Sequence, residues 1–298
     1  MNIQRFDYIA ADSVKHALAV LAEKGAGARV MAGGTDLMVK MNHGLLQASV
    51  LIDIKRIKEL EKISFDRQKG LTIGATALLA EVASHPDILA HYPAIADAAE
   101  ETANVQIRNM GTVAGNLCNA APSAESAPTL MAMGAEVILE SISGERRVSL
   151  DQFFTGPGQT CMEPGEIMTR IVVPAPLPQS GTSYKHISAR GKVDISAVCV
   201  GVMMSVQGKT CKEARIVLGA VAPTPMRATQ AEAVINGKKM TDEIIEKAGS
   251  QASDEARPIS DVRASADYRK KMVAVLTRRA LKEAHERAMK SYTGESAL

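Results

Sequence analysis

Apolar and polar residues alternate with the periods of helices and strands through the first part of the chain. Apolar residues recur at helical spacing at positions 14, 17, 18 and 21, and Asp12 or Ser13 can cap this helix. Glycines 25 and 27 end the helix, and the apolar run at 28–32 predicts a buried strand. Further strands are predicted at 50–54 and 71–74. This alternation of strand and helix is typical of a layered α/β sheet.

The middle of the chain predicts more helices and two further strands. Thr76 is expected to cap a helix that ends near Pro86, and the alanine-rich stretch 88–103 predicts one long helix. The expected elements that follow are a helical piece at 129–133 and strands at 135–140 and 167–173. Between them, the Thr-Gly-Pro-Gly sequence at 155–158 predicts a tight turn.

The pattern changes after the proline-rich stretch at 174–181, which is the most linker-like part of the chain. Two long apolar strands are predicted at 195–206 and 214–221, paired antiparallel across residues 207–209. Helices are then predicted at 228–235, 242–256 and 266–288. The last has an apolar face opposite a face of Arg and Lys, so a sheet backed by helices is expected here.

Composition narrows the classes of function. The net charge of +2 is too small to indicate nucleic acid or a membrane surface, and the absence of Trp leaves no stacking platform for single-stranded nucleic acid. No uncharged apolar window reaches the ~18 residues that a membrane span needs. The first six residues lack the apolar core of a signal peptide, so the expected location is cytoplasmic. The four scattered cysteines are then expected to be free thiols, which excludes a zinc ribbon or an iron–sulfur cluster in this chain.

Two glycine-bearing loops are the strongest candidates for chemistry. Gly33, Gly34, Thr35 and Asp36 follow the strand at 28–32 directly, and residues 106–116 form a second loop with Gly111 and Gly115. Missing Cβ atoms let backbone N–H groups approach a pyrophosphate closely. Either loop alone fits an ordinary tight turn equally well. Two such loops, each expected at the end of a strand in one domain, favour binding of a dinucleotide.

Other familiar sites are missing from the sequence. It contains neither G-x-x-x-x-G-K-[ST] nor G-x-G-x-x-G, and no G-x-S-x-G. The six histidines have no metal-ligand spacing and are expected to be ordinary surface or half-buried residues. Lys185 lies on a strand entering the second domain, where it is either a solvated lysine or a cation directed at a phosphate across the domain junction. Arg190 and Asp194 are expected to form a structural ion pair.

In combination, these motifs resemble a known family. Residues 32–37, 73–75, 106–109 and 111–116 are similar to the FAD-binding medium subunits of molybdenum hydroxylases, which include xanthine, carbon monoxide and nicotinate dehydrogenases. The likeness runs from about residue 6 to residue 287. Segments 155–158, 222–227 and 263–265 look most like the xanthine dehydrogenase branch.

The resemblance implies an α+β fold with two domains. Residues 1–176 would form a two-subdomain FAD-binding domain of the vanillyl-alcohol-oxidase (PCMH) type. Residues 182–290 would form a small domain of antiparallel sheet plus helices, similar to the C-terminal domain of the carbon monoxide dehydrogenase flavoprotein.

The resemblance also implies where FAD binds. Its pyrophosphate would lie on residues 32–36, and residues 112–116 would take the other side of the diphosphate and the ribityl chain. Cys118 and Glu125 would approach the cofactor, the backbone of Ile167 would meet the adenine, and Tyr184 and Lys185 would approach the flavin ring. Ala114 stands where many relatives have glycine, so its methyl group would have to fit beside the cofactor. The implied cofactor-binding residues are Arg29, Val30, Met31, Ala32, Gly33, Gly34, Thr35, Asp36, Gly111, Thr112, Val113, Ala114, Gly115, Asn116, Cys118, Glu125, Ile167, Tyr184 and Lys185.

The family's other cofactors would lie on partner chains, a molybdopterin-binding large subunit and an iron–sulfur small subunit. The implied function is to pass electrons from the partner's iron–sulfur clusters through FAD to an acceptor such as NAD. The complex would oxidise a purine such as xanthine or another N-heteroaromatic compound, and no catalytic residue or metal ligand is expected in this chain. Two alternatives stay open: a free-standing flavin-dependent oxidoreductase with its own substrate pocket, and a scaffold subunit without cofactor.

Overall fold

A computed structural model describes residues 5–191 and 194–293, so the first four residues of the segment inspected for a signal peptide lie outside it. The chain begins with a small parallel sheet in the order β1 (Asp7–Ala10), β3 (Val50–Asp53), β2 (Ala28–Met31). The predicted first helix is confirmed as α1 (Val14–Lys24), capped by the Ser13 side chain, which accepts from the His16 amide at 3.2 Å. The short turn η1 (Gly25–Gly27) then leads into β2.

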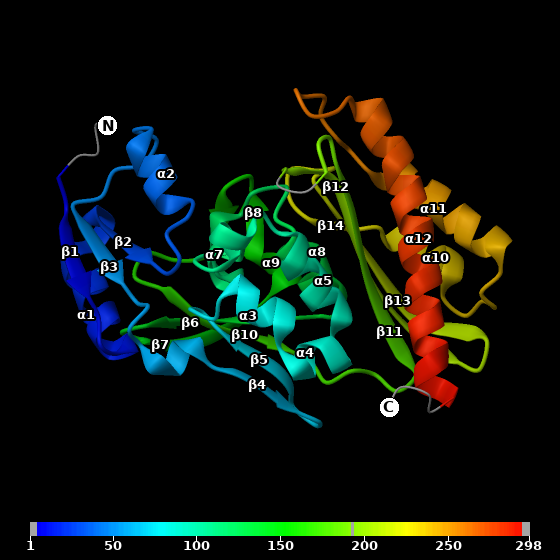
Figure 1. The fold of residues 1–298 in the computed structure, drawn as a ribbon, viewed down its shortest axis with the longest axis horizontal. Helices are drawn as coiled ribbons and strands as arrows, with labels where there is room; N and C mark the ends of the chain where they lie inside the picture. Colours follow the sequence, from blue (N-terminus) through cyan, green and yellow to red (C-terminus); the bar gives the residue numbers. More distant parts are fainter. Residues whose placement is uncertain (1–4, 192–193, 294–298) are drawn as a thin grey trace.

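A second, antiparallel sheet forms the body of the N-terminal half (Figure 1). Its strand order is β4 (Ile63–Asp66), β5 (Gly70–Gly74), β10 (Ile167–Val173), β6 (Glu136–Ser141), β7 (Gly144–Ser149). The apolar run at 167–173 predicted β10 with the bounds that the structure has. Smaller elements connect these strands: η2 (Lys58–Glu61), α9 (Leu150–Phe153), and the hairpin of β8 (Phe154–Gly156) and β9 (Gln159–Thr160) around the predicted turn.

Three predictions for this part of the chain were wrong: a helix cap, a single long helix, and a loop at the end of a strand. The helix after β5 is α3 (Leu79–Ser84), which begins three residues after Thr76; the Glu81 side chain accepts from the Leu78 amide at 2.9 Å instead. The alanine-rich stretch forms two helices, α4 (Pro86–His91) and α5 (Pro93–Glu101), because Pro93 lacks an amide N–H and cannot continue the first. The second glycine loop joins α6 (Val105–Arg108) to α7 (Val113–Asn119), so it does not end a strand.

The C-terminal half is an antiparallel sheet covered on both faces (Figure 1). The strands follow one another in the order β11 (Ser180–Ser188), β12 (Ser196–Gln207), β13 (Thr210–Gly219), β14 (Met226–Arg227), and the predicted pairing of the two long strands is confirmed. Helices α5 and α8 (Ser126–Ala132) pack on one face, and α12 (Ala266–Thr293) packs on the other. Because both faces of the sheet are covered, every residue of β12 except the last is buried, and most of them are apolar.

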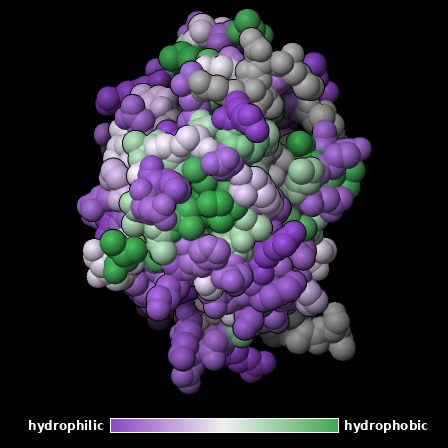
Figure 2. Space-filling view, turned by 90° about the vertical axis from the view of Figure 1, so that its left-hand side faces the viewer, coloured by the Kyte–Doolittle hydropathy of each residue, from purple (hydrophilic) through white to green (hydrophobic). Residues whose placement is uncertain are grey.

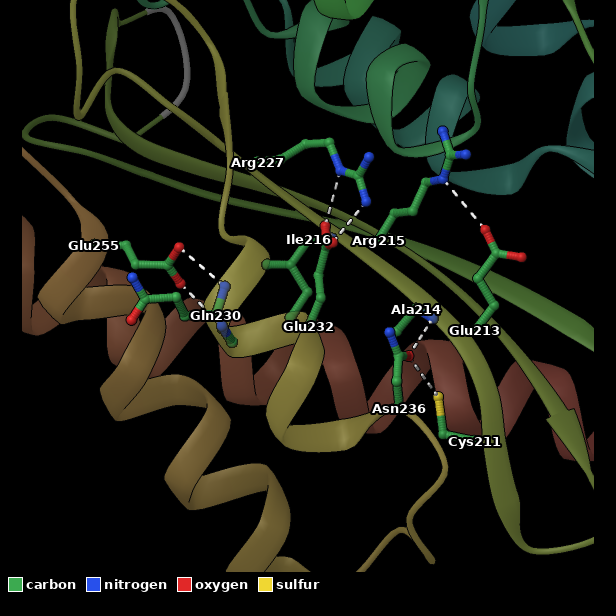
Figure 3. Close-up of polar contacts among 11 residues, drawn as sticks. Cys211, Glu213, Ala214, Arg215, Ile216, Arg227, Gln230, Glu232, Asn236 and Glu255 are labelled. Carbon is green, nitrogen blue, oxygen red and sulfur yellow. Dashed lines mark hydrogen bonds and ion pairs between the residues drawn. The ribbon is translucent and has the colours of Figure 1, made fainter.

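Polar side chains attach helix α10 to that sheet (Figure 3). Glu232 of α10 (Thr229–Ile235) accepts from the Ile216 amide of β13 at 2.9 Å and pairs with Arg227 at 2.6 Å. Asn236, directly after α10, accepts from the Ala214 amide at 2.8 Å. Helix α11 (Asp242–Glu255) packs on α10 and α12, and completes the outer layer.

The buried apolar core has two main parts, one in each half of the chain. One large cluster of buried apolar residues lies in the N-terminal half, and a second lies between the C-terminal sheet and its helices. A small cluster of Ala94, Ala98, Tyr184 and Cys199 joins them across α5 and β11. The face that carries β1 and α1 is mostly hydrophilic, with a hydrophobic patch near its centre and smaller ones toward its edges (Figure 2). Over the described part of the chain, no helix has the length and apolar character needed to cross a membrane.

Candidate functional site

A cavity of about 950 Å³ lies where the two glycine loops face the C-terminal domain. One wall is the end of β2 and the loop that leads into α2 (Leu37–Asn42). A second wall is formed by residues between Thr102 and Glu125, including the loop before α7. The C-terminal domain contributes Ile195 and Val262 to the same space. The cavity therefore joins segments that lie far apart in the sequence.

The first loop is fixed by direct backbone contact with the second. A Cβ on Gly33 would lie 2.2 Å from the carbonyl oxygen of Met110, so only glycine fits at this position. Gly34 has a φ of +72°, which also favours glycine. Its carbonyl accepts from the Met38 amide at 3.0 Å, so α2 starts directly from the loop. The first amides of such a helix have no partner within the helix and are directed toward its N-terminal end.

The second loop is held by α3 and by its own helix cap. The carbonyl of Gly111 accepts from the Leu79 amide at 2.9 Å. The Thr112 side chain accepts from the Gly115 amide at 2.9 Å and caps α7. Asn116 follows on the cavity wall, and the part of the chain that the structure describes offers its buried Oδ1 no hydrogen-bond partner. A buried acceptor in this state is costly unless a ligand supplies a donor.

Most of the residues implied by the family resemblance lie on this one cavity. Those that line it are Val30, Met31, Ala32, Gly33, Gly34, Thr35, Asp36, Gly111, Thr112, Gly115, Asn116, Cys118 and Glu125. The structure therefore brings both glycine loops and the residues that follow the second loop to a common space.

Four other implied residues lie behind the cavity walls. Arg29 donates to the carbonyls of Ala26 and Ala28, both at 2.7 Å, and does not line the cavity. Val113 and Ala114 are buried in the N-terminal core. The expectation that the Ala114 methyl group has to fit beside the cofactor is therefore not supported. Ile167 is buried at the start of β10, where it pairs with Glu140 of β6.

Tyr184 and Lys185 point to opposite sides of β11, and neither lines the cavity. Tyr184 is buried in the small cluster beside α5. The Lys185 ammonium lies 2.7 Å from Glu283 Oε2 of α12, and the Ser183 hydroxyl donates to the same carboxylate. Neither side chain reaches the cavity wall, and their approach to the flavin ring stays a prediction. The Lys185 partner, Glu283, lies far along the chain, and the local sequence gives no signal of it.

Several cavity residues were not predicted as site residues. Lys40 of α2 donates to Asn119 Oδ1 of α7 at 2.5 Å and so links the two helices that follow the glycine loops. Arg190 and Asp194, predicted as an ion pair, do pair at 3.1 Å, and both also line the cavity. Ile195, Val262 and Arg263 complete the side formed by the C-terminal domain. No motif marked Lys40 or Val262, because each is brought to the cavity only by the tertiary fold.

Glu125 is the most perturbed acid on the cavity wall. Its side chain is buried, and burial raises the pKa of the carboxyl to about 7 because the charged form is poorly solvated there. A hydrogen bond from Ser196 at 3.1 Å lowers this pKa, and the charge of Asp36 raises it. Among the described residues, no three His, Cys, Asp or Glu side chains are grouped closely enough to hold a metal ion.

Comparison with known proteins places this geometry in a family. Residues 4–176 match the model described as the FAD binding domain in molybdopterin dehydrogenase, and residues 182–284 match the CO dehydrogenase flavoprotein C-terminal domain. The chain belongs to the FAD-binding subunits of the molybdenum hydroxylases. It is therefore the FAD-binding subunit of an oxidoreductase, in a family whose molybdopterin and iron–sulfur clusters are carried by partner subunits.

Individual relatives cover almost the whole chain. The carbon monoxide dehydrogenase medium chain of Hydrogenophaga pseudoflava is 35% identical over 95% of this chain and 98% of its own length. The xanthine dehydrogenase FAD-binding subunit of Escherichia coli O157:H7 is 29% identical over 93% of this chain and 95% of its own. A structure of carbon monoxide dehydrogenase from H. pseudoflava matches with a TM-score of 0.92 and 36% identity, covering 96% of this chain and 99% of that one.

Proposed function

We propose that the cavity between the two glycine loops is the FAD site, with the pyrophosphate between residues 32–36 and 112–116. Its volume of about 950 Å³ is in the upper part of the range of roughly 300–1,000 Å³ typical of cofactor pockets. The strongest support for the proposal is the buried Asn116 Oδ1, which has no hydrogen-bond partner among the described residues. A hydroxyl group of the ribityl chain would supply the missing hydrogen-bond donor. Cys118 and Glu125 would also contact the cofactor.

We expect the residues that lie behind the cavity walls to position the two loops or to have no contact with FAD. Arg29, Val113 and Ala114 hold the two loops in position, while Ile167, Tyr184 and Lys185 make no contact with FAD. When bound, FAD supplies the redox chemistry. The chain itself binds the cofactor, orients it and excludes water from part of it.

The proposed role in the complex is electron transfer. Electrons would arrive from the iron–sulfur clusters of a small subunit and leave through FAD to NAD, while a molybdopterin-binding large subunit oxidises a purine or another N-heteroaromatic compound. The segments at 155–158 and 222–227, and a relative named for xanthine, support a purine. Of the two relatives, the carbon monoxide dehydrogenase chain has the higher sequence identity. Relatives that act on such different substrates support a shared role in electron transfer, with the substrate bound by the partner subunit.

An absorption spectrum of the purified chain, with mass spectrometry of what acid releases, tests the FAD site first. Flavin bands and released FAD support the proposal. A colourless chain that takes up no added FAD contradicts it and leaves the scaffold alternative. Reduction of the bound flavin by xanthine without partner subunits would favour the free-standing enzyme. NADH formation by the assembled complex with xanthine, and none with carbon monoxide, would support the proposed substrate and acceptor.

A further inference from the structure

A line of four hydrogen-bonding side chains runs from the cavity wall to the protein surface. Glu125 is 8% exposed and lies on the cavity wall, and its Oε1 accepts from Ser196 Oγ at 3.1 Å. His186 Nδ1 lies 3.2 Å from the same hydroxyl oxygen. His186 Nε2 lies 3.1 Å from Glu101 Oε2, and the Glu101 side chain is 38% exposed. The line therefore connects the cavity to solvent through residues of both domains.

The chemistry of these groups permits two arrangements of protons. An ionised Glu101 carboxylate only accepts, so His186 Nε2 carries a proton in both. In the first arrangement His186 is an imidazolium, Nδ1–H donates to Ser196, and Ser196 donates to an ionised Glu125. In the second, Glu125 is protonated and donates to Ser196, which donates to the unprotonated Nδ1 of neutral His186. The two differ only by one proton moved from His186 to Glu125 through the Ser196 hydroxyl.

We propose that Glu125, Ser196 and His186 form a proton relay between the FAD cavity and the surface carboxylate Glu101. The relay rests on the proposed function, because it serves the flavin only if FAD occupies this cavity. Reduction of FAD to its neutral, fully reduced form takes two electrons and two protons. The electrons would come from the partner's iron–sulfur clusters, and the relay would supply one of the protons.

Each transfer in the relay is balanced. Glu125 gives its proton into the cavity, the Ser196 hydroxyl proton moves to Glu125, and the Nδ1 proton of His186 moves to Ser196. His186 is left as a neutral imidazole whose Nε2 proton stays on the Glu101 side, so the proton delivered to the cavity is the one that Nδ1 held. Reoxidation of the flavin releases a proton by the same path in reverse.

Several other titratable groups surround the relay. Asp36 faces Glu125 from the first glycine loop, and Tyr184 and Cys199 face it from β11 and β12. Burial, together with nearby negative charge, holds the pKa of the Tyr184 phenol and the Cys199 thiol far above their ordinary values, so both stay neutral. The Tyr184 ring also stacks on His186, with centroids 5.8 Å apart, which fixes the imidazole. Glu101 faces His186 from the end of α5.

Titration of the full chain tests the relay without any flavin. Infrared spectra follow the protonated carboxyl of Glu125 and ¹⁵N NMR follows the His186 nitrogens, between about pH 5 and 8. The wild type should lose a carboxylic acid band with a midpoint near 7, Glu125→Gln should lack that band, and the His186 Nδ1 signal should respond to loss of the Glu125 proton through Ser196. In Ser196→Ala the Nδ1 signal should no longer respond to Glu125, because the hydroxyl that connects them is gone. Ser205→Ala is the matched control, since Ser205 is also buried on β12.

A His186 Nδ1 signal that still follows the protonation of Glu125 in Ser196→Ala would overturn the relay. In the FAD-loaded chain, flavin reduction by dithionite in water and in deuterium oxide gives a second readout. Ser196→Ala and His186→Gln should slow reduction at least about tenfold and remove the solvent isotope effect. Equal rates in these variants and in Ser205→Ala would also overturn it. A chain that takes up no FAD contradicts the proposed function instead, and leaves the titration result unaffected.

Discussion

Gly33 of the first glycine loop lies directly against the carbonyl of Met110 in the second, with room for no side-chain atom between them. The glycine is therefore required by contact between the two loops, before any cofactor is considered. This contact brings the end of β2 beside the segment that leads into α7. A larger side chain at position 33 would therefore separate the loops as well as block the close approach of a cofactor.

Gly33→Ala should lower both stability and FAD affinity. The new methyl group would overlap the Met110 carbonyl, and a misfit of this kind in a packed region costs about 1–3 kcal/mol. Gly208→Ala in the β12–β13 turn is the control, because its Cβ meets no atom within 4 Å and only its φ of +59° is strained. Denaturant unfolding and FAD titration of both variants provide the measurement. A Gly33→Ala chain with wild-type stability and wild-type FAD affinity would show that the loops do not touch as described.

Asn116→Ala should have opposite effects on the empty and the FAD-loaded chain. Without FAD, removal of a buried acceptor that has no partner should leave stability unchanged or raise it. With FAD, loss of the hydrogen bond should weaken binding by about 1–3 kcal/mol. Thermal unfolding with and without FAD measures both effects. Equal stabilisation by FAD in the variant and the wild type would remove Asn116 from the proposed site.

Glu125→Gln should change how stability depends on pH. Because the folded-state pKa of about 7 lies above the ordinary value of 4.5, the folded chain holds this proton more tightly than the unfolded chain. The stabilising contribution is complete below about pH 4.5 and is lost as the pH rises through 7, by up to about 3 kcal/mol. The FAD-free variant should therefore gain stability relative to wild type over this range. Parallel pH profiles from urea unfolding would contradict the raised pKa.

Lys185→Ala should leave the flavin unaffected. The ammonium group pairs with Glu283 on the α12 side of β11, so it lies away from the cavity. Loss of this partly exposed ion pair should cost under about 1 kcal/mol. The reduction potential and absorption spectrum of bound FAD, compared with those of wild type, check this directly. A shifted potential would restore the sequence-based expectation that Lys185 approaches the ring.

The sequence correctly predicted those helices and strands that depend mainly on residues close together in the chain. The apolar run of β10, the Ser13 cap of α1 and the pairing of β12 with β13 all follow from neighbouring residues. The break at Pro93 was also visible in the sequence, but the alanine-rich composition outweighed it in the prediction. The second glycine loop was expected at a strand end, whereas the residues on either side of it form the short helices α6 and α7.

The site was predictable only where the glycine motifs mark it. Both loops line one cavity, but the side formed by Ile195 and Val262 depends on how the two halves pack. The Ser196–Glu125 hydrogen bond joins residues 71 positions apart, and the Lys185–Glu283 pair joins helix α12 to β11. One sequence gives no signal for such contacts, because neither partner's neighbours differ from those of an ordinary strand or helix.

The position of FAD is tested most directly by titrating FAD into the cofactor-stripped wild type and Gly115→Val. Gly115 lies on the cavity wall at the start of α7, where a Cβ would meet only the Thr112 hydroxyl, at 3.0 Å. A branched side chain there should fill the cavity and leave the helix in place. We expect one FAD to bind per wild-type chain. In the folded Gly115→Val variant, FAD should bind at least about tenfold more weakly, which is a loss of about 1.4 kcal/mol in binding free energy. Wild-type affinity in Gly115→Val would contradict the placement of FAD between the two loops.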